Sequence, residues 1–353
     1  MNSVMMKLTL KNLYWFLLLI LPFMDTANGV INNGGNDGGI SLGIVYRIIM
    51  ICFSVYICVN NRIKKKIFFP FLLVIGSVFL SSLIGINHAS VFLNLAIRLL
   101  LPMLIIISYE SQKGLIEKNY LYDIIRYWSL IFPLTIIFPY ILGLGFDTYG
   151  AGTAGYKGFY YAQNDIGYIL AILYLFTLYE ISKGYSVKKI ITFLLLLVSN
   201  LVLGLKSNYM LVAAFTLCYI FSVSKKHNPQ LSKIFLMIMI ALGLFLISNL
   251  YANEINAIVN RWTFFYGSRE TLSFFTSSRS DRIPLAYNWV ISTYGIIGFL
   301  FGSGAEYTFH SVINEINTIE MDLFDLFFQL GLVGMLSVVF FYLKVFKDLS
   351  FQL

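Results

Sequence analysis

Long apolar stretches alternate with short polar segments along almost the whole chain. A helix needs about 20 apolar residues to cross the hydrocarbon core of a bilayer. The stretches that approach or reach this length cover residues 8–24, 40–60, 67–86, 90–108, 123–143, 166–182, 188–205, 207–223, 234–250 and 323–343. The pattern predicts an all-α, polytopic integral membrane protein, a single membrane domain over residues 1–353 with about 10 transmembrane helices. Only Lys206 and Ser207 separate the seventh and eighth stretches, so a re-entrant pair is an alternative there.

The composition agrees with this pattern and excludes several classes of soluble protein. Charged residues make up 12% of the chain and hydrophobic residues 58%, whereas a soluble domain carries about 25% charged residues. A disordered protein and a soluble nucleic-acid-binding domain are therefore excluded, and we expect no nucleic-acid partner. Cys52, Cys58 and Cys218 all lie within apolar stretches, where cysteine serves as a small apolar residue, which excludes a disulfide scaffold.

The distribution of the 25 Lys and Arg residues predicts the orientation in the membrane. Most of them fall in alternate connecting segments such as 62–66, 183–189 and 225–233, whereas the segment 144–165 holds only Lys157. Cytoplasmic loops carry an excess of Lys and Arg. The bias therefore places both termini in the cytoplasm.

A further apolar segment, 284–302, is long enough to cross the membrane. If it did, Lys344 and Lys347 would lie outside, against the charge bias. We therefore expect 284–302 to form a helix at the outer membrane surface, within a long outer loop that covers residues 251–322.

The outer loop at 144–165 is rich in glycine and carries a single base, Lys157. Glycine permits close approach of the backbone to a ligand. Lys157 and the exposed backbone amides could therefore bind an anionic head group, and Asn164 belongs to the same candidate binding surface. The alternative is structural, since Asn164 or Asp165 stands where an N-cap of the following helix is expected.

The long outer loop carries Arg261, Arg269, Arg279 and Arg282. The planar guanidinium of Arg forms paired hydrogen bonds with phosphate, so Arg279 and Arg282 are the best candidates for binding a phosphate group. The alternative is surface ion pairs, which contribute little to stability. Arg98, near the centre of the fourth stretch, is a further candidate, because an Arg at that depth is costly without a function. No acidic residue stands at mid-span to pair with it. Lys206 is a candidate for the same anion-binding surface, and the alternative is that it only forms part of the turn.

Three carboxylates, Glu320, Asp322 and Asp325, stand where the long loop enters the last stretch. A carboxylate next to an arginine cluster suits a general base beside a clamp for a leaving oxyanion. The alternative for Glu320 is a capping box with Asn317, which would not account for Asp325. His310 is a weaker candidate for substrate binding, and we expect no metal ligand set.

The order of the motifs resembles that of a known family. A glycine-rich loop ends in YAQND; LKSNYML opens a later helix; SRSDR and a segment ending in FGSG follow; IEMDLFDLFFQLGLVG then leads into the last stretch. This order resembles the O-antigen polymerase and ligase superfamily of bacterial membrane glycosyltransferases, most closely the Wzy-type polymerases, over roughly residues 140–345. Ligases usually have a His where IEMD stands here, which favours a polymerase, and Lys157 stands where relatives often have Arg.

The resemblance implies transfer of a glycan from undecaprenyl pyrophosphate onto a sugar hydroxyl of an incoming lipid-linked repeat unit, at the outer membrane face. It implies inversion at the anomeric carbon, no metal and no other cofactor, and a chain-length regulator as a partner. Such a reaction needs a base, for which Glu320, Asp322 or Asp325 could serve, and positive charge at the leaving pyrophosphate, for which Arg282 is the catalytic candidate. The alternatives are a ligase-type transfer, a flippase or other transporter, and a scaffold without catalysis. A transporter predicts internal repeats and several ionisable groups at mid-membrane; the sequence shows no repeat.

Overall fold

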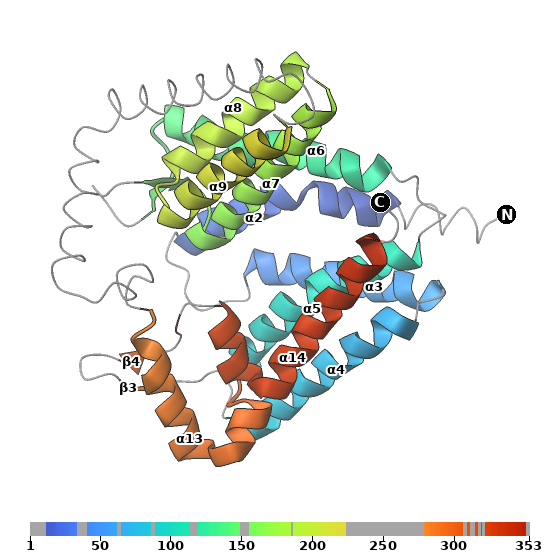
Figure 1. Cartoon of the computed structure of the whole chain (residues 1–353), viewed down its shortest axis with the longest axis vertical. Coiled ribbons are helices and arrows are strands. Elements are labelled where there is room, and N and C mark those ends of the chain that lie inside the picture. Colours follow the sequence, from blue (N-terminus) through green and yellow to red (C-terminus); the bar gives the residue numbers. More distant parts are fainter. Residues whose placement is uncertain are drawn as a thin grey trace. The chain divides into compact units, whose positions relative to one another are not determined.

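The computed structural model describes residues 12–33, 41–61, 65–85, 89–112, 119–148, 155–184, 186–223, 279–305, 309–310, 315–316, 319 and 322–350. Its elements are α2 (Leu21–Asn33), α3 (Leu42–Asn60), α4 (Lys65–Ile84), α5 (Ala89–Ser111), α6 (Asn119–Ile141), β1 (Phe146–Asp147), β2 (Tyr156–Gly158), α7 (Gln163–Lys183), α8 (Val187–Val202), α9 (Lys206–Val223), α13 (Arg282–Phe301), β3 (Phe309–His310), β4 (Glu315–Ile316) and α14 (Asp322–Ser350). The chain forms two compact units (Figure 1). The first unit comprises residues 1–45 and 117–263, and the second comprises residues 46–116 and 264–353.

Seven helices in the described part of the chain are long and apolar enough to cross a membrane. The helix pair Asn12–Leu19 and Leu21–Asn32, bent by 52°, adds an eighth if the pair is one span. These helices confirm the prediction of an all-α, multi-pass membrane protein. The predicted span at 234–250 lies outside the described residues. The seven qualifying segments are Leu42–Asn60, Lys66–Ile84, Val91–Ser111, Leu121–Ile141, Gln163–Lys183, Arg282–Phe301 and Asp322–Lys347.

Helices α8 and α9 stand at the seventh and eighth predicted stretches. Helix α8 has 16 residues, a length of about 24 Å at 1.5 Å per residue, which is less than the about 30 Å of a bilayer core. Its first turn is capped by Ser186, whose side chain accepts a hydrogen bond from the Lys189 amide at 3.3 Å. The turn at residues 203–205 then leads into α9, so these helices form a closely connected pair.

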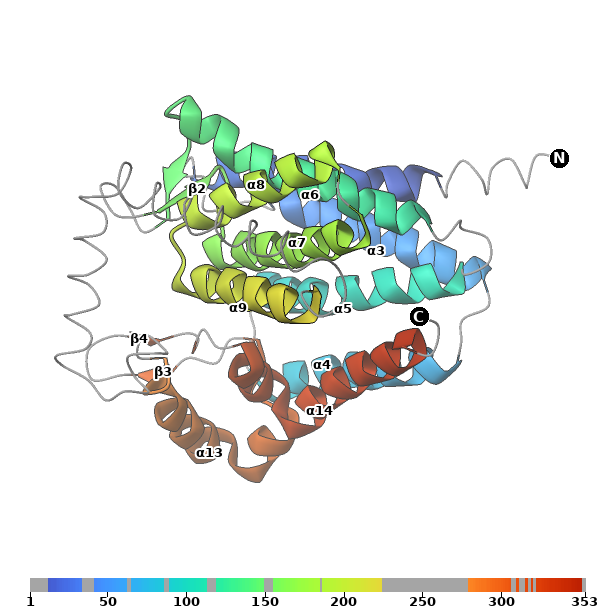
Figure 2. The same ribbon diagram turned by 45° about the horizontal axis from the view of Figure 1, so that its top comes forward.

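The core of the first unit lies among helices α6, α7, α8 and α9, which pack together as a bundle (Figure 2). Buried side chains from all four helices meet there, including Phe132, Leu170, Tyr174, Phe193 and Val212. The hydroxyls of Tyr174 and Thr216 are hydrogen-bonded at 2.7 Å. This bundle holds both ends of α7 in place, and each end carries a separate polar cluster.

The second unit is built around α14, which packs against α4 and α13, and α5 also packs against α4. Val74, Met103, Leu330 and Phe341 are fully buried in its core. The strands β3 and β4 form a short antiparallel pair in which His310 lies opposite Glu315.

Two helices of the second unit are interrupted by glycines. In α13 the break is at Gly295 (φ 60°, ψ −146°), and in α14 it is at Gly331 (φ 71°, ψ 179°). The amide of Ser303, which follows α13, donates to the Phe328 carbonyl at 2.9 Å, and that of Gly304 donates to the Gln329 carbonyl at 3.2 Å. The segment after α13 therefore supplies hydrogen bonds at the interruption of α14. Helix α13 agrees closely with the expected helix at 284–302, and its placement at the membrane surface stays a prediction.

Candidate functional site

The glycine-rich loop of the first unit forms a short hairpin between α6 and α7. Strands β1 and β2 pair antiparallel, and the Tyr156 hydroxyl donates to the Leu144 carbonyl. The Thr148 hydroxyl donates to the Leu203 carbonyl at 2.8 Å, which ties the hairpin to the turn between α8 and α9. Burial, together with nearby Asp147, raises the pKa of Tyr156 to about 12. The described strands of the hairpin are therefore joined to the turn that precedes Lys206.

Lys157 lies on this hairpin, and its Nζ donates to the Tyr161 carbonyl at 3.0 Å. Burial lowers the pKa of Lys157 from its usual value. Asn164 lies in the first turn of α7, which begins at Gln163 after Ala162, and no side chain caps the helix there. The capping interpretation of Asn164 and Asp165 was therefore wrong, because the helix starts before them and places both inside its first turn.

A buried amide cluster in the first unit was missed by sequence reasoning. The Asn208 Nδ2 donates to Asn200 Oδ1 at 2.7 Å and to the Gly167 carbonyl at 3.1 Å. Both asparagines are fully buried. A Cβ at Gly167 would come 2.6 Å from Asn208 Oδ1, so glycine is required for this contact. The cluster brings together the segments that contain YAQND and LKSNYML. Polar residues inside apolar stretches are the sequence feature that could have predicted it.

In the second unit, Arg98 of α5 and Asp322, the first residue of α14, form an ion pair. Their Nη2 and Oδ1 atoms lie 3.3 Å apart, and their side chains are 69% and 72% exposed. The expectation that Arg98 lacks an acidic partner was wrong. Side chains on a helix point toward its N-terminus, so Arg98 reaches away from the middle of α5 and meets an acid at the start of another helix.

Arg279 and Arg282 occupy one turn at the start of α13, where the Arg282 amide donates to the Arg279 carbonyl at 3.1 Å. Asp281 accepts a hydrogen bond from the Ser280 hydroxyl at 3.3 Å in the same turn. The turn thus presents two guanidinium groups from neighbouring positions. Arg261 and Arg269 lie outside the described residues.

The two described carboxylates of the predicted cluster have different surroundings. Asp322 faces Arg98, whereas Asp325 Oδ1 accepts the amide of Ile319 at 2.9 Å, a bond that shapes the segment before α14. Glu320 lies outside the described residues. His310 is described only as part of strand β3. Among the described residues, no group of three His, Cys, Asp or Glu side chains could hold a metal ion.

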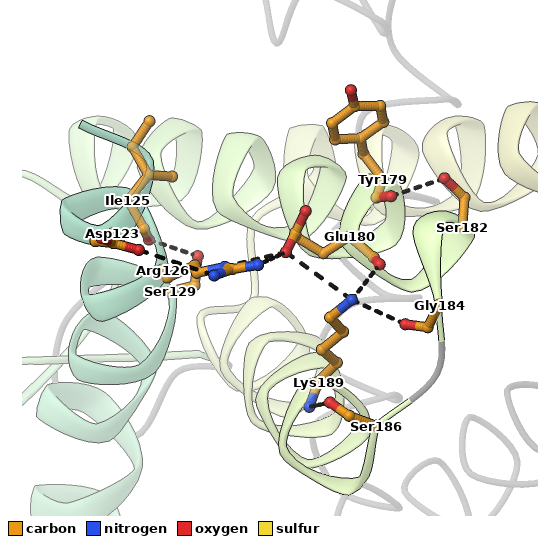
Figure 3. Close-up of polar contacts among 10 residues, drawn as sticks. All are labelled: Asp123, Ile125, Arg126, Ser129, Tyr179, Glu180, Ser182, Gly184, Ser186 and Lys189. Atoms are coloured by element: carbon orange, nitrogen blue, oxygen red, sulfur yellow. Dashed lines mark hydrogen bonds and ion pairs between the residues drawn. The ribbon is translucent and has the colours of Figure 1, made fainter. Parts of the chain in front are cut away.

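At the other end of α7 a buried carboxylate, Glu180, bonds to two neighbouring helices (Figure 3). Arg126 of α6 donates to Glu180 Oε2 through Nε at 3.0 Å and Nη2 at 2.5 Å. Lys189 of α8 donates to the carbonyls of Glu180 at 2.7 Å and Gly184 at 2.8 Å. Arg126 also lies 3.8 Å from Asp123. Only 4% of the Glu180 side chain is exposed, so this cluster joins α6, α7 and α8 as a structural unit.

Two tyrosine rings contact positive side chains at the same end of α7 as Glu180. The Arg126 guanidinium lies 4.6 Å from the Tyr122 ring centre, and the Lys183 ammonium lies 4.2 Å from that of Tyr179. Such cation–π contacts are worth about 0.5–1 kcal/mol at exposed sites. Glu180 was not among the expected residues, because one acid near the end of an apolar stretch resembles an ordinary loop boundary.

The structure therefore brings together two of the predicted residues, Arg98 and Asp322, and places Arg279 and Arg282 within one turn. Lys157, Asn164 and Lys206 belong to the first unit, and each lies at or beside the same loop end of its bundle. Chemically, the second unit offers the Asp322 carboxylate beside the Arg98 guanidinium, which suits deprotonation of a hydroxyl next to a bound phosphate. The loop end of the first unit offers the ammonium groups of Lys157 and Lys206 and a glycine-rich backbone.

The chain was then compared with known proteins. Residues 7–264 match the family model described as O-antigen ligase like membrane protein. No curated protein and no solved structure matches the chain. The family match includes the N-terminal helices, which the expected range of 140–345 left out, and ends before α13 and α14. Because it covers more than half of the sequence, the chain belongs to this family, and membership indicates membrane glycan transfer.

Proposed function

From membership of the O-antigen ligase like family, we propose that this chain is a polymerase of lipid-linked oligosaccharide repeat units. It joins units carried on undecaprenyl pyrophosphate into O-antigen, capsule or exopolysaccharide at the outer face of the bacterial cytoplasmic membrane, with both termini in the cytoplasm. A chain-length regulator is its expected partner. The observation that carries the proposal is the exposed Arg98–Asp322 pair in the unit that also holds Arg279 and Arg282.

The proposed reaction is a single displacement. Asp322 accepts the proton of a sugar hydroxyl on the acceptor unit, and that oxygen forms a bond to the anomeric carbon of the donor glycan. The bond between this carbon and the pyrophosphate oxygen breaks, and undecaprenyl pyrophosphate leaves with the electron pair. Attack from the opposite side inverts the anomeric configuration. Glu320 is the alternative base.

Positive groups lower the energy of this step because negative charge develops on the leaving pyrophosphate. Arg282 and Arg279 bind that group, and Arg98 holds Asp322 in position while adding a third positive charge. Asp325, whose carboxylate is bound to the Ile319 amide, acts as a positioning residue for the segment that contains Glu320. Within the second unit, His310 is proposed to bind the glycan. Within the first unit, Lys157, Asn164 and Lys206 are proposed to bind the glycan or pyrophosphate of a lipid-linked unit.

The decisive experiment is the size of the surface glycan in cells that lack this chain, compared on a gel with complemented cells. A polymerase predicts that the ladder collapses to a single unit on its final acceptor. Complete loss of surface glycan, with lipid-linked units inside the cell, would indicate a flippase. A full ladder that stays on the lipid carrier would indicate a ligase.

Variants then test the site. Asp322→Asn keeps the size of the side chain but cannot accept the proton, and we expect it to give single units only. Arg282→Gln is expected to do the same, because it removes a positive charge from the leaving group. The matched control is Lys188→Gln, at an exposed position of α8, which should complement fully. Full ladders with both site variants would overturn the assignment.

A further inference from the structure

Kinks at Gly295 and Gly331 divide α13 and α14 in the second unit. The parts before the kinks, residues 282–294 and 322–330, pack against each other as a half-helix pair. They share a small core, which consists of Ala286, Val290, Ile319 and Phe328. The main core of the unit lies mostly among α4, α5 and the part of α14 after its kink. The half-helix pair is therefore a small body with a core of its own, beyond two kinks.

The half-helix pair carries two residues of the proposed reaction. Arg282 is the first residue of α13 and Asp322 the first of α14, whereas Arg98, whose Nη2 lies 3.3 Å from Asp322 Oδ1, belongs to α5. Asp322 therefore stays beside Arg98 only if the half-helix pair keeps one angle to the rest of the unit. An exposed ion pair contributes too little to fix that angle, so another contact has to do so.

Ser303, in the segment after α13, makes that contact. It is fully buried, and its amide and its hydroxyl both donate to the Phe328 carbonyl, at 2.9 Å each. In an unbroken helix this carbonyl would accept the amide of Leu332. The Gly304 amide donates to the Gln329 carbonyl in the same way, at 3.2 Å. Two consecutive residues from outside α14 thus bind the last turn of its half-helix.

The segment that contains Ser303 also lies directly against the end of α4. A Cβ on Gly85, just after α4, would come 1.8 Å from the Ser303 carbonyl oxygen, so the two backbones are in contact. The later part of α14 packs on the same helix, since a Cβ on Gly334 would lie 3.1 Å from the Cβ of Ser77 in α4. Ser303 therefore connects the half-helix of α14 to the frame formed by α4 and the later part of α14.

We propose that Ser303 is a positioning residue for glycan transfer, because its hydroxyl fixes the angle of the half-helix that presents Asp322. This inference rests on the proposed function, which makes Asp322 the base. Asp322 lies about 9 Å along the helix from Phe328, so a tilt of about 10° at the kink displaces it by about 1.5 Å. A misplacement of about 1 Å can lower a reaction rate about 100-fold. The Ser303 hydroxyl thus acts on transfer without touching the substrate.

The first test measures the angle as the distance between two spin labels on α14 of the purified full chain. Leu323→Cys and Leu343→Cys place the labels before and after the kink, at positions that are 57% and 62% exposed, after replacement of the three native cysteines by alanine. With Ser303 present we expect one narrow distance, shorter than the about 30 Å of a straight helix. Ser303→Ala should broaden it or shift it by several ångströms. A broad distribution with Ser303 present would overturn the inference without any variant of Ser303.

Ser337→Ala is the matched control. Ser337 is a buried serine of α14, and its hydroxyl donates to the Val333 carbonyl at 2.7 Å, so this bond stays within the later part of the helix. Each substitution removes one hydroxyl and one hydrogen bond, and Ser303→Ala keeps the amide bond to Phe328. Thermal unfolding should therefore give similar midpoints for both variants. Only Ser303→Ala should change the distance between the labels.

The second test measures transfer, with lipid-linked repeat units extracted from cells that lack the chain. We expect Ser303→Ala, without labels, to lower the rate at saturating units about tenfold or more. Its KM should stay within about twofold, because Arg282 keeps its place within the half-helix pair. Ser337→Ala should transfer at the unaltered rate. An unchanged rate in Ser303→Ala, or an equal loss in Ser337→Ala, would refute the positioning role.

The outcomes separate this inference from the proposed function. If Ser303→Ala changes the label distance but cells with Asp322→Asn keep a full glycan ladder, the assignment of Asp322 as the base fails, while the hold of Ser303 on the half-helix stands. If Asp322→Asn gives single units and Ser303→Ala transfers normally, the positioning role of Ser303 alone fails.

Discussion

Gly302 and Gly331 lie against each other where α13 ends and α14 is interrupted. A Cβ at Gly302 would overlap the Gln329 carbonyl, and one at Gly331 would overlap both Leu300 and the Gly302 amide. Both glycines have positive φ, 87° and 71°. Backbone groups released by a break within a membrane must find other partners, and here the amides of Ser303 and Gly304 provide them. The FGSG and LGLVG segments are therefore two sides of one packing contact.

Gly331→Ala should destabilise the protein strongly. A left-handed conformation costs a non-glycine residue about 1–2 kcal/mol, and the overlap with Leu300 adds to this. The control is Gly76→Ala on α4, where a Cβ meets nothing within 4 Å and helix propensity favours alanine by about 0.5–1 kcal/mol. Thermal unfolding in detergent measures both. Equal stability of the two variants would contradict the account of the contact.

Substitutions in the Arg98–Asp322 pair should affect transfer far more than stability. Exposed ion pairs contribute about 0–1 kcal/mol, and both side chains are mostly exposed. Loss of a base or of an oxyanion-stabilising group commonly costs about 100-fold in rate. A double-mutant cycle with Arg98→Ala and Asp322→Ala, measured by unfolding, should therefore give a coupling free energy below about 1 kcal/mol. A stability loss that parallels the activity loss would instead indicate a structural pair.

Arg126→Met should destabilise the first unit, because it leaves the buried Glu180 carboxylate without its guanidinium partner. Breaking a fully buried pair from one side costs about 3–5 kcal/mol, whereas replacing both partners with apolar residues is often neutral. The loss here should be smaller, because Arg126 is half exposed and Lys189 Nζ remains 4.0 Å from Glu180 Oε2. The double variant Arg126→Met/Glu180→Leu should therefore recover most of the loss in an unfolding experiment. Asp123→Asn is the control, because Asp123 contacts the same guanidinium from an exposed position. A double variant no more stable than Arg126→Met would refute this reading.

Lys157→Arg should extend activity to higher pH. Burial lowers the pKa of Lys157 below its usual 10.5, so the ammonium is present below the lowered pKa and is lost as the pH rises through it. Activity that needs this charge falls over that window. The free energy of unfolding changes in the opposite direction. The folded state disfavours the charged form of Lys157, and because this penalty disappears as the pH rises, stability increases.

Arginine stays protonated throughout this range, so the alkaline loss of activity should move upward in Lys157→Arg. The measurement is the pH dependence of transfer by purified protein. Lys188→Arg, at an exposed lysine of α8, should leave the profile unchanged. Superimposable profiles of Lys157→Arg and the unaltered chain would show that the Lys157 charge takes no part in the reaction.

The apolar pattern was sufficient for most of the described helices because a segment in lipid must satisfy its own backbone hydrogen bonds, although α2 (Leu21–Asn33) extends well beyond the expected stretch 8–24. The expected stretch 40–60 and α3 (Leu42–Asn60) differ by two residues at one end, and the hairpin carrying Lys157 is in the predicted loop. These conclusions depend only on local polarity, which the sequence displays directly.

Pairings between distant segments were decided by the tertiary structure alone. Arg98 and Asp322 are 224 positions apart, and no local pattern joins the middle of one helix to the start of another. Glu180 became a buried anchor only through the packing of α6 and α8 around α7. The interruption at Gly331 likewise depends on the segment that crosses it, because a glycine in an apolar stretch does not reveal its φ. Side-chain reach and helix packing are properties of the assembled fold, and they determine which of the residues present in the sequence act together.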